Sequence, residues 1–82
     1  MVTPEDVRIY IERGLPCEHI ELAGDGQHFQ ALIVSTEFQG KNRVQRHQRV
    51  YQALGERMRE EVHALSMQTL TPEEWRARPP EE

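Results

Sequence analysis

The sequence lacks the features of a secreted or membrane-spanning domain. Cys17 is the single cysteine among 82 residues, so an internal disulfide framework is excluded and a reducing compartment is expected. No segment approaches the roughly 18 consecutive apolar residues that a membrane-spanning helix needs. The first residues, MVTPEDVRIY, contain no basic region followed by an apolar run, so we expect no secretory signal. These absences predict a cytoplasmic protein with no membrane partner.

A basic overall charge and a catalytic motif are also lacking. The formal net charge of -4 argues against strong non-specific binding of nucleic acid by the whole domain. No nucleophile stands at a motif spacing from a base, and no glycine-rich phosphate-binding loop is present, so no enzymatic activity is expected. Hydrophobic residues make up 37% of the chain, enough for one small domain with a modest core.

Capping residues predict two short helices, one toward each end of the chain. Thr3 precedes a proline and two acidic residues, so a helix is expected over residues 4–13. In the segment TPEEWRA, Thr71 precedes a proline, and Glu74 completes a capping box three residues after the threonine. This segment predicts a last short helix, and residues 79–82 are expected to form a frayed tail.

A longer helix is expected over residues 43–59, with Asn42 as its N-cap. One face of this helix, which we interpret as the face toward the core, collects the residues Val44, His47, Tyr51, Leu54 and Met58. Gly55 would then be a weak point inside the helix that costs about 1 kcal/mol relative to alanine.

Three strands are expected, and two of them form a hairpin. The segment EHIELAGDGQHFQALIVST alternates apolar and polar residues around Asp25 and Gly26, a pair that favours a type I′ turn. The second hairpin strand is richer in apolar residues, which places it centrally, with Phe29, Ala31 and Ile33 on one face. The third strand, VHALSMQTL, follows the long helix, so a crossover can pair it in parallel with a hairpin strand.

Together these elements predict an α+β domain over residues 1–78 with the order α-β-β-α-β-α. A three-stranded mixed sheet with the helices packed on one face is the natural two-layer arrangement for them. Phe38, in the loop TEFQGKN, is expected to be buried against this core.

Two histidines stand out as candidate metal ligands. His63 begins the third strand in phase with apolar residues, and periodicity alone favours a structural, partly buried histidine there. The alternative is a ligand to zinc, iron or a cluster, since either imidazole nitrogen can bind such a metal. His28 follows the hairpin turn, and either a solvated turn residue or a second ligand fits that position. If the two strands are parallel, both imidazoles lie at the same end of the sheet, although two ligands cannot complete a tetrahedral site.

The other candidates are weaker. Cys17 and His47 are interpreted as structural residues, the first a buried thiol and the second on the apolar face of the long helix. The basic residues in and before that helix are Lys41, Arg43, Arg46, Arg49, Arg57 and Arg59. Arg43, Arg46 and Arg57 fall on one stripe beside the apolar face, and Arg49 lies adjacent. The candidate surface consists of Lys41, Arg43, Arg46 and Arg49. This stripe is either a solvated rim or a surface for DNA phosphates or an acidic protein.

Three segments in order resemble the BolA-like family: HFQALIVSTEFQGK, RVQRHQRVY and VHALSMQTLTPEEW. The resemblance runs from the first helix to Trp75, and the short GDGQHF hairpin is similar to the acid-stress IbaG branch. It implies a fold like the class II KH domain. It also implies partnership with a cytosolic monothiol glutaredoxin, with a [2Fe–2S] cluster bridged between the two proteins.

In such a complex the resemblance implies the following ligands. The glutaredoxin contributes a cysteine and glutathione contributes another thiolate, while the BolA-like protein contributes the histidine of its HAL strand, here His63. The second ligand comes from the hairpin loop, where His28 is the matching residue and Asp25 is an alternative. Two imidazoles and two thiolates resemble the Rieske arrangement, and no cofactor is expected in the isolated chain.

The resemblance also implies DNA binding, because BolA proteins are often described as transcriptional regulators. The helix RVQRHQRVY is basic, but the net charge is negative and the segment FQGKN lacks the second glycine of a KH phosphate-clamping loop. We therefore rank an iron–sulfur adaptor first and a DNA-binding regulator second. A purely structural interaction module without metal is the third hypothesis.

Overall fold

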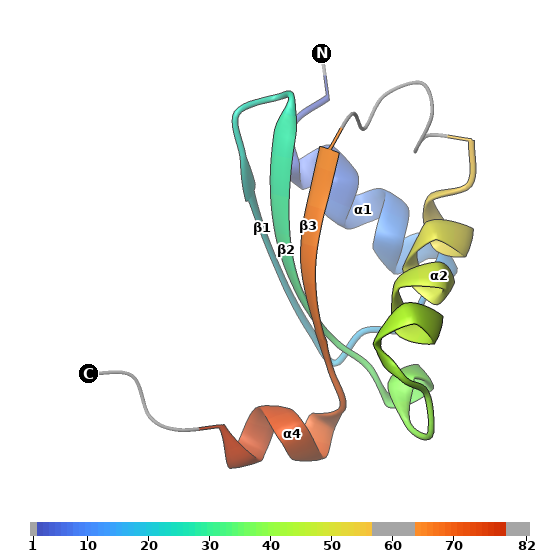
Figure 1. Cartoon of the computed structure of the whole chain (residues 1–82). Coiled ribbons are helices and arrows are strands. Elements are labelled where there is room, and N and C mark those ends of the chain that lie inside the picture. The colour runs from blue at the N-terminus through green and yellow to red at the C-terminus, as the bar shows by residue number, and fades with distance from the viewer. Residues whose placement is uncertain (1, 57–63, 79–82) are drawn as a thin grey trace.

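The structure is a computed structural model that describes residues 2–56 and 64–78 (Figure 1). Its described elements follow the predicted order, with a short 3-10 helix, η1, added after the second strand. They are α1 (Pro4–Gly14), β1 (His19–Gly24), β2 (His28–Val34), η1 (Thr36–Phe38), α2 (Arg43–Leu54), β3 (Ala64–Leu70) and α4 (Pro72–Ala77). Among these residues, none of the helices has the length and apolar character needed to cross a membrane.

The sheet is mixed, with the strand order β1-β2-β3 and β2 in the centre. β1 and β2 are antiparallel, and their register pairs Ile20 with Ile33. β2 and β3 are parallel, and their register pairs His28 with Ala64 at one end and Val34 with Leu70 at the other. The central position of β2 and the parallel crossover were both predicted from the sequence, and both are confirmed.

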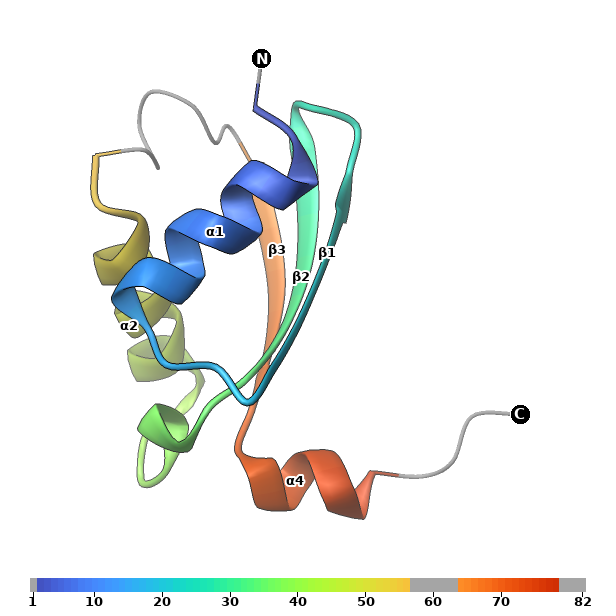
Figure 2. The same cartoon turned by 180° about the vertical axis from the view of Figure 1, so that it is seen from behind.

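The core lies between the sheet and the two longer helices. Figure 2 shows α1 crossing one face of the sheet, and Figure 1 shows α2 beside it on the same side. Phe29 and Ile33 point from β2 into this layer, where they are buried with Ile11 of α1 and Val50 of α2. Phe38 of η1 is fully buried in the same cluster, as predicted.

α4 is placed differently from the other two helices. It continues from the end of β3 and lies beyond the end of the sheet (Figures 1 and 2). Its Trp75 ring stacks on the ring of His19 from β1, with the ring centres 4.7 Å apart. The predicted packing of the helices on one face of the sheet is therefore confirmed for α1 and α2, whereas α4 covers the end of the sheet where β1 begins.

Each α-helix within residues 2–56 and 64–78 begins with the predicted cap. In all three, the N-cap side chain accepts a hydrogen bond from the backbone of the third helical residue, whose side chain accepts one in return. The three reciprocal pairs are Thr3 with Asp6, Asn42 with Gln45, and Thr71 with Glu74. These boxes satisfy backbone donors that a helix start leaves free, so local sequence was sufficient to locate the starts.

The predicted end of α2 is wrong. The helix ends at Leu54, and Gly55 is its C-cap with a φ of 59° and an amide that donates to the Tyr51 carbonyl. A positive φ is readily adopted by glycine, so Gly55 ends the helix instead of weakening its interior. The predicted last turn, residues 57–59, lies outside the described residues.

The predicted inner face of α2 is also wrong in part. Val44 is 65% exposed and Tyr51 is 39% exposed, whereas Val50 and Leu54 are buried. The reason is the close approach of α1, because a Cβ at Gly14 would lie only 2.9 Å from the Ala53 Cα. This contact turns α2 toward α1 and leaves Val44 and Tyr51 outside; Met58 lies outside the described residues.

The hairpin loop differs from the predicted type I′ turn. That turn needs positive φ at both central residues, but Gly26 has a φ of 99° and no described residue other than glycine has positive φ. Instead, one carboxylate oxygen of Asp25 accepts the amides of Gln27 at 3.0 Å and His28 at 2.9 Å. The Asp25 side chain thus forms an Asx turn, which replaces the hydrogen bond of a backbone turn in this loop.

Candidate functional site

The first candidate site lies where β2 and β3 begin. Because these strands are parallel, both start at the same end of the sheet (Figure 1). The register sets His28 level with Ala64. The side chain of His28 is exposed and Ala64 is half-buried. His63, the residue bonded to Ala64 in the sequence, lies outside the described residues, so the structure describes one of the two predicted ligands.

The backbone around His28 is held tightly. Two amide donors, those of His28 and Gln27, keep the pKa of the Asp25 carboxyl below its ordinary value. Gly24 lies so close to the returning strand that an added Cβ would be 2.6 Å from the His28 carbonyl oxygen. The loop therefore presents an exposed imidazole on a fixed backbone, while the alternative ligand Asp25 already uses one carboxylate oxygen inside the loop.

The remaining described histidines lie elsewhere. His19 is at the opposite end of the sheet, where its Nε2 lies 2.6 Å from a carboxylate oxygen of Glu21. His47 lies on α2, where burial, and then the nearby Arg43 charge, lower its pKa below the ordinary value. Over residues 2–56 and 64–78, no group of three or more His, Cys, Asp or Glu side chains is placed to hold a metal ion.

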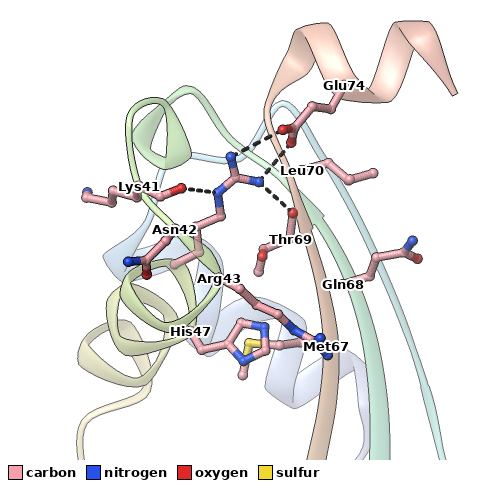
Figure 3. Close-up of a pocket in the computed structure, with 10 residues that line it drawn as sticks. Lys41, Asn42, Arg43, His47, Met67, Gln68, Thr69, Leu70 and Glu74 are labelled. Atoms are coloured by element: carbon pink, nitrogen blue, oxygen red, sulfur yellow. Dashed lines mark hydrogen bonds and ion pairs between the residues drawn. The ribbon is translucent and has the colours of Figure 1, made fainter.

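The second candidate site is a groove between α2 and β3, which we call the α2–β3 groove. It has a volume of about 530 Å³ and is drawn in Figure 3. Its lining is Lys41, Asn42, Arg43, Arg46, His47, Met67, Gln68, Thr69, Leu70 and Glu74. Three of the predicted basic residues, Lys41, Arg43 and Arg46, thus line a groove beside the edge of the sheet, whereas Arg49 does not. Periodicity on α2 alone could not show that β3 is the neighbour of these residues.

Arg46 is a structural residue of this groove. Its guanidinium donates to the carbonyls of Lys41 at 2.9 Å and Thr69 at 3.0 Å, and to both carboxylate oxygens of Glu74 at 2.8 and 3.3 Å. The side chain is only 15% exposed. A single arginine therefore ties the start of α2 to β3 and α4, which sequence spacing did not reveal because the partners lie far apart in the chain.

The other basic residues differ in whether their charge is used in contacts inside the domain. Arg49 donates to the Glu37 carboxylate at 3.2 Å and to the Gly14 carbonyl at 3.0 Å, so it also serves internal contacts. Lys41 donates to the Glu37 carbonyl at 2.9 Å, and Arg43 is exposed. Neither Lys41 nor Arg43 forms an ion pair with a carboxylate among residues 2–56 and 64–78, so these two supply accessible positive charge in the described part of the basic set. Arg57 and Arg59 lie outside the described residues.

Taken together, the structure is a small α+β domain with an exposed histidine at one sheet end and a basic groove along one sheet edge. The family model described as BolA-like protein matches residues 1–74. The chain belongs to the BolA-like family, as its sequence segments predicted.

Two curated relatives carry different functional names. The Haemophilus influenzae protein named DNA-binding transcriptional regulator BolA is 46% identical over 59 residues, which are 72% of this chain and 57% of that protein. The chain thus spans less than two thirds of that relative. The Escherichia coli acid stress protein IbaG is 34% identical over 71 residues, which are 85% of this chain and 84% of that protein. Both names describe a regulator or a stress protein, and neither describes an enzyme.

The fold is shared with solved members of the family. The structure of a BolA protein homologue from Coxiella burnetii superposes with a TM-score of 0.82 at 42% identity, covering 93% of this chain and 99% of that chain. This match confirms the predicted α+β architecture. The likeness to class II KH domains stays a prediction.

Proposed function

We propose that this protein is an iron–sulfur adaptor that pairs with a cytosolic monothiol glutaredoxin. In this proposal His63 and His28 bind one iron of a shared [2Fe–2S] cluster, and the glutaredoxin cysteine and glutathione bind the other. The pair would bind, sense or transfer the cluster in iron–sulfur homeostasis and stress response, in the cytoplasm. The proposal rests on the family resemblance of the HAL strand and hairpin loop.

One observation carries the proposal beyond the resemblance. The parallel register sets His28 opposite Ala64, and the peptide bond joins Ala64 to His63. This register supports the proposed pairing of ligands, because it sets His28 level with the residue that follows His63 in the sequence. The exposed imidazole of His28 leaves a ring nitrogen available to a partner-held metal.

The donor set suits iron of a [2Fe–2S] cluster. Imidazole ligation in place of two thiolates is known to raise the reduction potential of such clusters. Since a metal-bound imidazole must be deprotonated at the binding nitrogen, retention of the cluster should weaken as the pH falls through the histidine range. The hairpin contributes by fixing the His28 backbone through Asp25.

The test is co-expression of the chain with a monothiol glutaredoxin, followed by visible circular dichroism and quantification of iron and sulfide. We expect His63→Ala and His28→Ala to change the spectrum and to lower the cluster content of the complex. His19→Ala is the matched control, because this half-buried histidine lies at the other end of the sheet. A wild-type spectrum with full iron and sulfide in His63→Ala would refute the ligand assignment.

DNA binding is the second candidate function, favoured by the name of the Haemophilus influenzae relative. The accessible cations for phosphate contact are Lys41 and Arg43, since Arg46 and Arg49 hold internal partners. Each lost phosphate contact should reduce the slope of log affinity against log salt by about one. Duplex binding that does not weaken with salt, or that is unchanged in Arg43→Gln, would exclude this function.

A further inference from the structure

The outer edge of β3 carries backbone groups that no described strand pairs, because β3 is the last strand of the sheet. The Leu70 carbonyl points toward β2, where it accepts the amide that follows that strand at 3.0 Å. The Thr69 carbonyl points the other way and accepts from Arg46. Since successive strand residues alternate in direction, the amide and carbonyl groups of Leu65 and Met67 also point outward.

This outer edge of β3 borders the α2–β3 groove. Met67 and Thr69 line the groove opposite residues of α2. Figure 3 shows the side chains of Arg43 and His47 leaving α2 toward β3 near Met67. The Thr69 carbonyl accepts from Arg46 at one end. Among residues 2–56 and 64–78, no strand pairs with the outward backbone groups of Leu65 and Met67.

The groove has an excess of positive charge. The charge of Arg46 is balanced by the Glu74 carboxylate. Lys41 donates to a carbonyl, and Arg43 has no carboxylate partner among residues 2–56 and 64–78. Burial keeps the pKa of His47 low, so this ring adds little charge near neutral pH. A ligand here meets strand hydrogen-bonding groups and two cations that no carboxylate of the described residues pairs.

We propose that the outer edge of β3 binds an extended acidic peptide segment of a partner protein, which adds to the sheet as a fourth strand. The backbone of Leu65 and Met67 would supply the strand hydrogen bonds, and Arg43 and Lys41 would pair with its carboxylates. An extended acidic peptide can pair with both the strand hydrogen-bonding groups and the cations, whereas a DNA backbone would use only the cations. The proposal uses the outer edge of β3 and two cations before and on α2, and neither of the proposed cluster ligands takes part in it.

Amide hydrogen exchange on the ¹⁵N-labelled full chain tests this directly. The probe is an acetylated and amidated peptide of alternating glutamate and valine, five residues long. At ten times its Kd, exchange at the Leu65 and Met67 amides should slow about tenfold. Ser66 and Gln68, whose amides point to β2, should change little and serve as internal controls.

Two comparisons separate strand addition from simple charge attraction. The same peptide with N-methyl groups on its pairing edge should not slow exchange at Met67. Arg43→Gln should weaken binding severalfold, while Arg13→Gln, a change of an exposed arginine on α1, should not. Absence of slowed exchange at millimolar peptide, equal protection by the methylated peptide, or shifts confined to Lys41 and Arg43 would each overturn the proposal.

Discussion

Replacing Arg46 with methionine tests whether one side chain joins three elements. Methionine keeps much of the unbranched stem but removes every hydrogen bond of the guanidinium. The carbonyls of Lys41 and Thr69 then lose their donors, and the Glu74 carboxylate loses its cation. We expect the free energy of unfolding to fall and the attachment of α4 to weaken.

The magnitude follows from the exposure of each partner. A hydrogen bond contributes about 1 kcal/mol net, so the two carbonyl contacts amount to about 2 kcal/mol. The ion pair adds less than about 1 kcal/mol, because the Glu74 side chain is 46% exposed and water screens it. The sum is a loss of about 2–3 kcal/mol, which for a domain of this size lowers Tm by roughly 10 °C or more.

Urea unfolding followed by fluorescence and by far-UV circular dichroism is the assay. Trp75 is the single tryptophan and lies on α4, so its fluorescence reports that helix while circular dichroism reports the whole domain. In Arg46→Met the tryptophan transition should come at lower urea than the dichroism transition. Two coincident transitions would instead indicate that α4 unfolds with the rest.

Arg43→Met is the matched control, because it removes the same type of side chain from an exposed position on the same helix. It should change stability by no more than about 0.5 kcal/mol. The reasoning fails if Arg46→Met is as harmless as this control. Arg46 would then be available for phosphate contact, and the DNA-binding candidate would gain support.

The remaining predictions concern the hairpin and two ionisable groups. Gly24→Ala should destabilise the domain by more than about 1 kcal/mol, because the added Cβ would clash with the His28 carbonyl and the Phe29 ring. Urea unfolding measures this loss, and unchanged stability would contradict the close contact. Two amide donors lower the pKa of Asp25, so the stability that its carboxylate contributes is complete above the unfolded-state pKa and is lost as the pH falls through the lower folded pKa. The difference in unfolding free energy between the wild type and Asp25→Ala should therefore shrink in acid. A difference that does not change with pH would contradict this prediction. Burial raises the pKa of Cys17 to about 11, so iodoacetamide at pH 8 should alkylate it far more slowly than free glutathione, and equal rates would show an accessible thiolate.

Helix starts and strand order were predictable because their signals are local. The caps Thr3, Asn42 and Thr71 satisfy donors within their own first turn, and the parallel pairing of β3 follows from its place after a helix. The inner face of α2 was not predictable from its periodicity. Its orientation depends on the contact of Gly14 with Ala53, which joins two distant segments.

The residues of the candidate sites also differ in how far the sequence alone could predict their role. His28 could be predicted as a surface residue at a sheet end because a hairpin loop directly precedes it, and the structure bears this out. Arg46 could not be separated from Arg43 by sequence, since both lie on the same stripe of α2. Arg46 is a structural residue because Glu74 and the edge of β3 lie within reach of its guanidinium, whereas Arg43 is exposed.

The mixed sheet has a consequence for the order of folding. β1 and β2 are joined by a short loop and can pair early, whereas β3 reaches β2 only after the whole of α2 has been placed between them. We therefore expect β3 to join the sheet late, so that substitutions at its buried positions mainly accelerate unfolding and leave the folding rate little changed. Until β3 arrives, its place beside β2 is open, and a β3 strand from a second copy of the chain could occupy it as a kinetic trap that grows with protein concentration.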